Sequence, residues 1–268
     1  MKQIEAKIVS NLPVAPGWRE LVLSWDGADA RPEPGQFMTL RVSPRYDPLL
    51  RRPLAFASAA ADGSTVSAIY QVRGSATLLL SELSPGSIVD VLGPLGRPFP
   101  RPEEGERAIL AAGGIGLGPV LYLARELGGK PARRSGKAVE RPALVLGFRD
   151  AACVPNVEFP EGTFLCTDDG SAGVRGFPSD LIARNVPAEM RVRLYGCGPA
   201  PMLASLAALA ASRGWAASLS AEQWMACGVG ACMGCAVRRA DGRGYLRACA
   251  DGPVFDGGAV DWAAEASR

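Results

Sequence analysis

The sequence predicts an N-terminal antiparallel β-barrel, then an α/β domain, then a small C-terminal region built around cysteines. Three observations lead to this β + α/β class. Short alternating runs fill the first hundred residues, strands and helices alternate after them, and four cysteines stand among glycines near the end. A chain of 268 residues is long enough for about two domains, so the cysteine region must pack against one of them.

Residues 1–104 form the predicted barrel. Because no long helical pattern interrupts this part, a small antiparallel barrel is the structure that buries the apolar faces of its strands. One short helix is expected at residues 78–83, and a breaker rich in proline and glycine ends the domain at residues 96–105. Four runs with apolar alternation are the expected strands: 3–10, 18–24, 36–42 and 66–72.

Residues 105–217 form a predicted Rossmann-like nucleotide domain. Strands that alternate with helices indicate a parallel sheet covered on both faces. Helical spacing appears at residues 119–127 and 201–213, and the basic stretch 130–141 is interpreted as a solvated loop. Four short apolar runs are the expected strands: 107–112, 143–147, 163–166 and 192–195.

The composition excludes several classes of protein. The chain has no histidine, which rules out histidine-based triads, haem or zinc held by histidine, and Rieske centres. Its 29 basic and 27 acidic residues leave a net charge of only +2, so no nucleic-acid or membrane-surface partner is expected. Neither an apolar signal core nor a membrane-spanning run is seen, so we expect a cytoplasmic protein whose thiols stay reduced.

The strongest signal is the cysteine motif within residues 218–268. Cys227, Cys232 and Cys235 follow the spacing C-x4-C-x2-C, and Cys249 comes after 13 further residues. The first three match the ligand spacing of plant-type [2Fe–2S] clusters, which are held by four thiolates. Intervening glycines let the backbone wrap closely and aim amide groups at the sulfur atoms. A zinc site with four cysteine ligands is the alternative, although zinc sites usually show two C-x2-C pairs and this motif has one.

Two glycine-rich turns of the α/β domain indicate a nucleotide site. Each follows a predicted strand and opens a helix, at the sheet edge where such folds bind their ligands. A tight strand–helix turn without a ligand is the alternative for each turn taken singly. The residues concerned are Gly114, Gly116, Gly118, Cys197, Gly198 and Pro199.

Two features of the barrel suit a diphosphate. Arg52 places a cation beside the extended backbone that Pro53 imposes. Residues 74–77 add a hydroxyl and open backbone amides ahead of the predicted helix. Taken alone, an exposed arginine and an ordinary helix cap explain these two features better.

In combination, the motifs resemble those of the ferredoxin-reductase-like flavoproteins. Residues 222–235, with the pattern E-x2-M-x-C-G-x-G-x-C-x-G-C, resemble more closely the electron-transfer subunits of the two-subunit, NAD-linked (type B) dihydroorotate dehydrogenases. The segment 168–173 also fits those subunits, and the resemblance extends to about residue 255. The motifs follow the family's order along the chain: Arg52-Pro53, residues 74–77, residues 93–96, residues 113–119, Cys197-Gly198-Pro199 and the cysteine motif.

The resemblance implies FAD between the barrel and the nucleotide domain, NAD at the two glycine-rich turns, and a [2Fe–2S] cluster on the four cysteines. No side chain is given an acid–base role. The cluster ligands are Cys227, Cys232, Cys235 and Cys249, and the flavin contacts are Arg52, Pro53, Leu54, Ala55, Ile69, Tyr70, Gln71, Ala76 and Thr77.

The same resemblance implies an oxidoreductase subunit. Electrons run from the FMN of a dihydroorotate dehydrogenase catalytic subunit through the cluster and FAD to NAD⁺, as part of de novo pyrimidine (UMP) biosynthesis. The partner docks near the cluster, and the assembly is a heterotetramer of two subunits of each kind.

Two positions depart from the family pattern, and two other functions stay open. Ala55 replaces the Ser or Thr that usually offers a hydroxyl to the flavin ring, and Ala76 replaces a Gly before Thr77. The first alternative is an NAD(P)H–flavin–iron–sulfur reductase subunit of another complex, such as a sulfhydrogenase or a glutamate-synthase-like enzyme. The second is a zinc-stapled nucleotide-binding module without redox activity.

Overall fold

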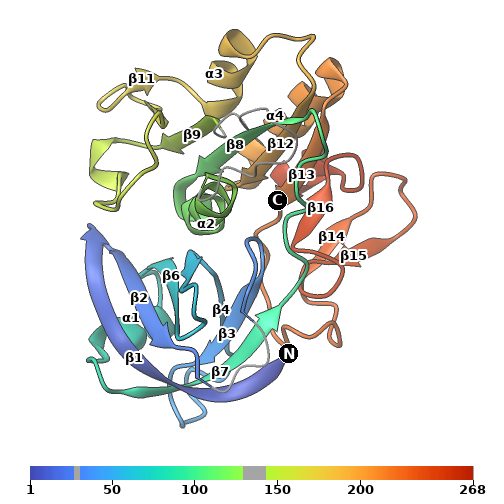
Figure 1. Ribbon diagram of the computed structural model, residues 1–268. Helices are drawn as coiled ribbons and strands as arrows, with labels where there is room; N and C mark the ends of the chain where they lie inside the picture. The colour runs from blue at the N-terminus through green and yellow to red at the C-terminus, as the bar shows by residue number, and fades with distance from the viewer. Residues whose placement is uncertain (27–30, 129–142, 268) are drawn as a thin grey trace.

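The structure is a computed structural model, which describes residues 1–26, 31–128 and 143–267 (Figure 1). The basic stretch interpreted as a loop, residues 130–141, lies outside these ranges. The N-terminal barrel, the α/β sheet and the C-terminal cysteine region are the three parts of the fold, as the sequence predicts.

Seven strands form the first sheet, in the order β4-β3-β7-β1-β2-β6-β5, and every neighbouring pair is antiparallel. Their bounds are β1 Lys2–Ala15, β2 Trp18–Ser24, β3 Phe37–Arg41, β4 Arg52–Ala55, β5 Ser58–Ala59, β6 Thr65–Gln71 and β7 Ile88–Leu95. Pro53 is tolerated in β4 because that strand lies at the edge of the sheet.

The two edges of this sheet are joined by two residues. Phe56 and Ala57 connect β4 to β5, and their amides donate to the carbonyls of Gln36 (3.2 Å) and Ser67 (2.8 Å). The link closes the sheet on itself, which confirms the predicted barrel. The helix expected at residues 78–83 is also present and starts earlier, as α1 Ser75–Glu82.

The second sheet has the order β11-β10-β9-β8-β12-β13-β16 and is parallel except for β16. Its strands are β8 Arg107–Gly113, β9 Ala143–Phe148, β10 Phe164–Thr167, β11 Val174–Arg175, β12 Val192–Cys197, β13 Ala216–Ser220 and β16 Val254–Asp256. The chain runs from β8 outward to β11 and then returns to β12 on the other side. The topological switch point therefore lies between β8 and β12, where open α/β sheets bind their ligands.

Helices cover both faces of the second sheet (Figure 1). Leu117 and Leu121 of α2 (Leu117–Gly128) share a core with Ala57 and Ile69 of the barrel, so this face joins the two domains. The opposite face is covered by α3 Pro178–Asn185, α4 Ala200–Arg213 and α5 Trp262–Ala266. The short 3-10 turns η1 Gly114–Gly116 and η2 Ala151–Cys153 complete the helical elements described here.

The C-terminal region leaves the second sheet and comes back to it. After β13 the chain forms the cysteine segment and the hairpin β14 Ala236–Arg238 and β15 Tyr245–Arg247, and β16 then pairs with β13. The proposed boundary between residues 217 and 218 thus falls inside β13. The division into residues 1–104, 105–217 and 218–268 stays a proposal.

Candidate functional site

The four motif cysteines lie in one loop and in the turn that follows the returning strand β15. Cys227, Cys232 and Cys235 stand on the cysteine loop, residues 227–235, which runs directly into β14. Cys249 follows β15 and stands next to Ala248, whose amide donates to the Cys235 carbonyl at 3.0 Å. The Sγ atoms of Cys235 and Cys249 are 3.2 Å apart, and all seven cysteines of the chain are free thiols.

The four thiols form two pairs. The Sγ atoms of Cys235 and Cys249 are in contact, and the Cys232 thiol is close enough to Cys227 to help lower the pKa of that thiol. Within the described ranges, no group of three Cys, Asp or Glu side chains lies close enough together to hold a single metal ion. Four thiolates arranged as two pairs match a two-iron cluster, in which each iron takes two protein ligands. The residues present therefore fit a [2Fe–2S] group.

Every one of these sulfur atoms accepts a backbone amide. Amide donors stabilise thiolates and the further negative charge of a reduced cluster, so this shell suits the predicted group. The four bonds are Val229 N to Cys227 (3.5 Å), Gly234 N to Cys232 (3.4 Å), Cys249 N to Cys235 (3.4 Å) and Gly230 N to Cys249 (3.1 Å).

Glycine makes this wrapping possible at two positions. Gly228 and Gly230 have φ of +70° and +83°, a region that side chains disfavour. A Cβ on Gly228 would lie 3.0 Å from the Thr39 side chain, so the loop packs directly on the barrel there.

The first and last cysteines of the motif differ in the pKa of their thiols. Partial burial opposes ionisation of Cys227, but hydrogen bonds from the Val229 and Cys232 amides outweigh it and lower its pKa to about 6. Burial, together with the neighbouring Cys235, raises the pKa of Cys249 to about 12. A metal cluster would bind both as thiolates, so binding at Cys249 must release a proton.

The predicted flavin strand borders the cysteines. Ala55 of β4 packs against a small core that contains Phe37, Leu95, Cys235 and Cys249. The Arg52 guanidinium, at the start of the same strand, donates to the Leu50 carbonyl at 2.6 Å. Residues far apart in sequence thus meet at one junction between the barrel and the cysteine loop.

Of the other predicted flavin contacts, two are buried in the barrel and two lie in the first turn of α1. Ile69 and Tyr70 face the interior, and the Tyr70 hydroxyl donates to Asn11 at 3.0 Å. The Thr77 hydroxyl accepts from the Gly74 amide (3.1 Å) and donates to the Gly74 carbonyl (3.0 Å), so its printed contacts hold the start of α1. Ala76 is buried in the first turn of that helix.

Two buried polar atoms in the described barrel have no hydrogen-bond partner: Gln71 Oε1 and Thr39 Oγ1. An unsatisfied buried polar group costs about 1–3 kcal/mol, so each is suited to a bound group. Gln71 lies at the end of β6 just before α1, where the sequence predicts a flavin contact. Thr39 was not predicted, because only the β3–β4 register places it opposite Pro53.

The two glycine-rich turns meet at the switch point. A Cβ on Gly116 would lie 2.2 Å from the Cys197 carbonyl oxygen, and one on Gly198 would lie 3.0 Å from the Gly113 amide. Gly118 lies beside Ala57 of the barrel, and a Cβ added to Gly118 would be 3.3 Å from the Ala57 Cβ. The turns thus form a close backbone cradle next to the barrel, which fits a dinucleotide.

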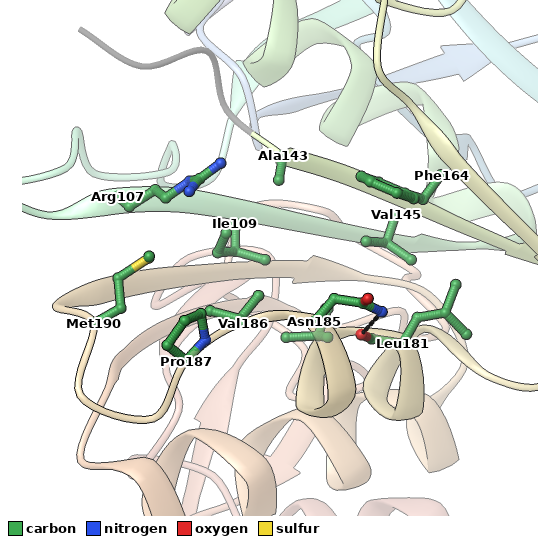
Figure 2. A pocket seen from close by; sticks show the side chains of 11 residues that line it. Arg107, Ile109, Ala143, Val145, Phe164, Leu181, Asn185, Val186, Pro187 and Met190 are labelled. Atoms are coloured by element: carbon green, nitrogen blue, oxygen red, sulfur yellow. Dashed lines mark hydrogen bonds between the residues drawn. The ribbon is translucent and has the colours of Figure 1, made fainter.

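A separate hollow of about 130 Å³ lies at the amino ends of β8 and β9, beside α3 (Figure 2). It is too small for a dinucleotide and lies at the opposite end of the strands from the glycine-rich turns. Figure 2 shows its lining, which includes Arg107, Ile109, Val145, Phe164, Leu181 and Met190. None of these is a predicted site residue.

Fold and site together define a ferredoxin-reductase-like protein with a C-terminal iron–sulfur site. The NADH-dependent reduced ferredoxin-NADP oxidoreductase superimposes with a TM-score of 0.82 at 24% identity, over 99% of this chain and 92% of that one. Phthalate dioxygenase reductase gives 0.59 at 22% identity, over 78% and 64%. Both likenesses concern the fold.

The particular family follows from sequence comparison. A family model for the iron–sulfur cluster binding domain of dihydroorotate dehydrogenase B matches residues 222–261. The dihydroorotate dehydrogenase B (NAD(+)) electron transfer subunit of Geobacillus sp. (strain WCH70) is 39% identical over 268 residues, 97% of this chain and 99% of that protein. That of Bacillus caldolyticus is 40% identical over 261 residues, 94% and 96%. The chain belongs to this family, and the resemblance inferred from its motifs is confirmed.

Proposed function

We propose that this chain is the electron-transfer subunit of an NAD-linked dihydroorotate dehydrogenase in de novo pyrimidine biosynthesis. It takes electrons from the FMN of a catalytic subunit and delivers them to NAD⁺. When bound, a [2Fe–2S] cluster supplies single-electron transfer, FAD supplies exchange between single electrons and a hydride, and NAD⁺ accepts the hydride.

One observation carries this proposal: the Cys235–Cys249 pair packs against the barrel strand that bears Ala55. A one-electron group held by the cysteines and a flavin held along Arg52–Ala55 would therefore be neighbours, without any intervening domain. The glycine-rich turns reach the same barrel at Ala57. The three predicted binding regions thus converge on one side of the barrel.

The residues of this chain act by position and by hydrogen bonding. Backbone amides in and beside the cysteine loop support negative charge on the sulfur atoms. Gln71 offers a buried acceptor for the flavin, and Arg52 fixes the start of β4 through its bond to the Leu50 carbonyl. The glycines at 116 and 198 let the two turns pack together, and the backbone at Gly114, where an added Cβ would meet no described atom within 4 Å, leaves room for a pyrophosphate.

The partner in this proposal is an FMN-containing catalytic subunit, in an assembly of two plus two. Trp224, Val229 and Met233 lie in or beside the cysteine loop and are exposed, Trp224 by 91%. Exposed apolar side chains in such a patch suit a protein interface. The cytoplasm is the proposed compartment, in keeping with seven free thiols. Among the described residues, no helix has both the length and the apolar character to span a bilayer.

An anaerobic visible spectrum, recorded before and after NADH, tests the proposal. Overlapping flavin and iron–sulfur bands that bleach with NADH are expected, together with orotate-forming, NAD-dependent activity after co-expression with the catalytic subunit. A colourless protein that contains zinc would instead establish the zinc-stapled module. Bleaching by NADH without activity in the co-expressed complex would point to the reductase subunit of another complex.

A further inference from the structure

We propose that Arg247 is a positioning residue of the iron–sulfur site. It holds Gly230 so that the Gly230 amide stays directed at Cys249 Sγ, and it thereby raises the reduction potential of the bound cluster. The inference rests on the proposed function only in requiring that a [2Fe–2S] cluster occupies the four cysteines.

Arg247 is fixed by a two-pronged ion pair. Its Nε and Nη2 atoms donate to the two carboxylate oxygens of Asp251, at 2.9 Å and 3.0 Å, and its own amide donates to the same carboxylate at 2.8 Å. The Asp251 amide donates back to the Arg247 carbonyl at 2.8 Å. The turn from 247 to 251, which carries Cys249, is therefore closed by both backbone and side-chain bonds.

The remaining arm of the guanidinium reaches the cysteine loop. Arg247 Nη1 donates to the Gly230 carbonyl at 3.0 Å, while the Gly230 amide donates to Cys249 Sγ at 3.1 Å. A Cβ on Gly230 would lie 2.9 Å from Ala250 and 3.2 Å from Nη1, so residue 230 is tightly enclosed as well. Both backbone polar groups of Gly230 are thus held: its carbonyl accepts from Arg247, and its amide donates to the Cys249 sulfur.

This arrangement affects the cluster through the amide–sulfur bond. Reduction adds negative charge to the cluster, and an amide donor to a ligand sulfur favours the more negative state. The charge of Arg247 itself is largely offset by Asp251 beside it. The larger effect therefore comes from the direction of the Gly230 amide and not from net charge.

Potentiometric titration followed by EPR, on the iron-loaded protein, tests the proposal with three variants and one control. Arg247→Ala removes the bonds to both Asp251 and Gly230. Arg247→Lys keeps the positive charge without the planar guanidinium that pairs with the Asp251 carboxylate. Asp251→Asn weakens that pairing and also removes a negative charge. Each is expected to lower the midpoint potential, by up to about tenfold in the reduction equilibrium, or about 59 mV for one electron. Arg239→Ala breaks an exposed Arg–Asp pair on the same hairpin and is expected to leave the potential unchanged.

Asp251→Asn distinguishes an effect of charge from an effect of positioning, because the two change the reduction potential in opposite directions. Loss of a nearby negative charge alone would raise the potential, whereas loss of positioning lowers it. A raised potential in this variant, or a wild-type potential in Arg247→Lys, would overturn the proposal. Loss of iron from all three variants, with iron retained in Arg239→Ala, would also overturn it, in favour of a purely structural clamp. Failure of the wild-type protein to bind a [2Fe–2S] cluster would refute the proposed function itself.

Discussion

Gln223 Nε2 donates a 2.8 Å hydrogen bond to Oε2 of the buried Glu265 and so joins the segment before the cysteine loop to the C-terminal helix α5. Oε1 of the same carboxylate accepts the Arg238 amide at 2.9 Å, just beyond the loop. One carboxylate therefore holds both ends of the segment that carries three of the four cysteines. The family model for the iron–sulfur domain ends before it, at residue 261.

Glu265→Ala is expected to destabilise the cysteine region. The substitution leaves the Arg238 amide and the Gln223 side chain without this buried partner, at a cost of about 1–3 kcal/mol in the free energy of unfolding. Urea unfolding and iron retention during dialysis measure the effect. Glu82→Ala, at an exposed position of α1, is the matched control. Equal stability of the two variants would contradict the role of Glu265.

Cys232→Ala is expected to lose the cluster and partner-linked turnover while it keeps direct NADH oxidation through FAD. The variant removes one thiol of the Cys227 pair, and a two-iron cluster needs four ligands. Iron analysis and the visible spectrum measure the loss. Cys153→Ala, at a half-buried cysteine outside the motif, should retain full iron content. Full iron content in Cys232→Ala would show that the ligand assignment is wrong.

Gln71→Leu is expected to change flavin content and protein stability in different directions. The buried Oε1 atom has no hydrogen-bond partner among the described residues, so its removal should leave the flavin-free protein as stable or slightly more stable. FAD retention through gel filtration should fall, because the acceptor for the flavin is gone. Unchanged FAD retention would mean that Gln71 does not contact the flavin.

Gly116→Ala is expected to separate the two glycine-rich turns. The added Cβ would lie 2.2 Å from the Cys197 carbonyl oxygen, and backbone must shift to relieve the overlap. We expect a loss of about 1–3 kcal/mol in stability and a higher KM for NADH. Gly128→Ala, at the other end of α2, is the control, because an added Cβ there would meet no described atom within 4 Å. If both variants bind NADH equally well, the cradle is not the nucleotide site.

The ion pair between Glu106 and Arg193 should make the stability of the protein depend on pH. Burial opposes its ionisation, but the Arg193 guanidinium, 2.7 Å away, outweighs this and holds the pKa of Glu106 below its usual range. A lowered folded-state pKa adds stability above the unfolded-state value of about 4.3, and that stability is lost as the pH falls through the folded-state value. Glu106→Gln should therefore lower the free energy of unfolding by about 2 kcal/mol at pH 7. The difference in stability between this variant and wild type should shrink as the pH falls.

Urea midpoints between pH 7 and pH 3.5 measure this difference. Asp241→Asn removes an exposed partner of Arg239, and its effect on the urea midpoint should be small at every pH. A gap between wild type and Glu106→Gln that stays constant in acid would rule out the ion pair as the source of the pH dependence.

Where sequence patterns predict a strand or helix correctly, the signal is local. The strands around Gly113 and Cys197 were found from apolar runs that end in glycine-rich turns, and the structure places both turns at one edge of the sheet. The helix α3 is not predicted, since half of its eight residues are polar and only Pro178 marks its start. Neither β16 nor α5 is predicted from the sequence, yet β16 pairs with β13 and α5 packs on the core of the second sheet.

By itself, the sequence determined the cysteine spacing, the glycines that let the loop wrap around the sulfur atoms, and the order of barrel and α/β domain. These depend on residues close together along the chain, whose geometry is set by backbone preference and periodicity. Only the tertiary structure decided that Ala55 lies against Cys235, that Gly116 closes on Cys197 and that Arg247 reaches Gly230. Such contacts depend on strand register and on the packing of separate layers, which no local pattern specifies.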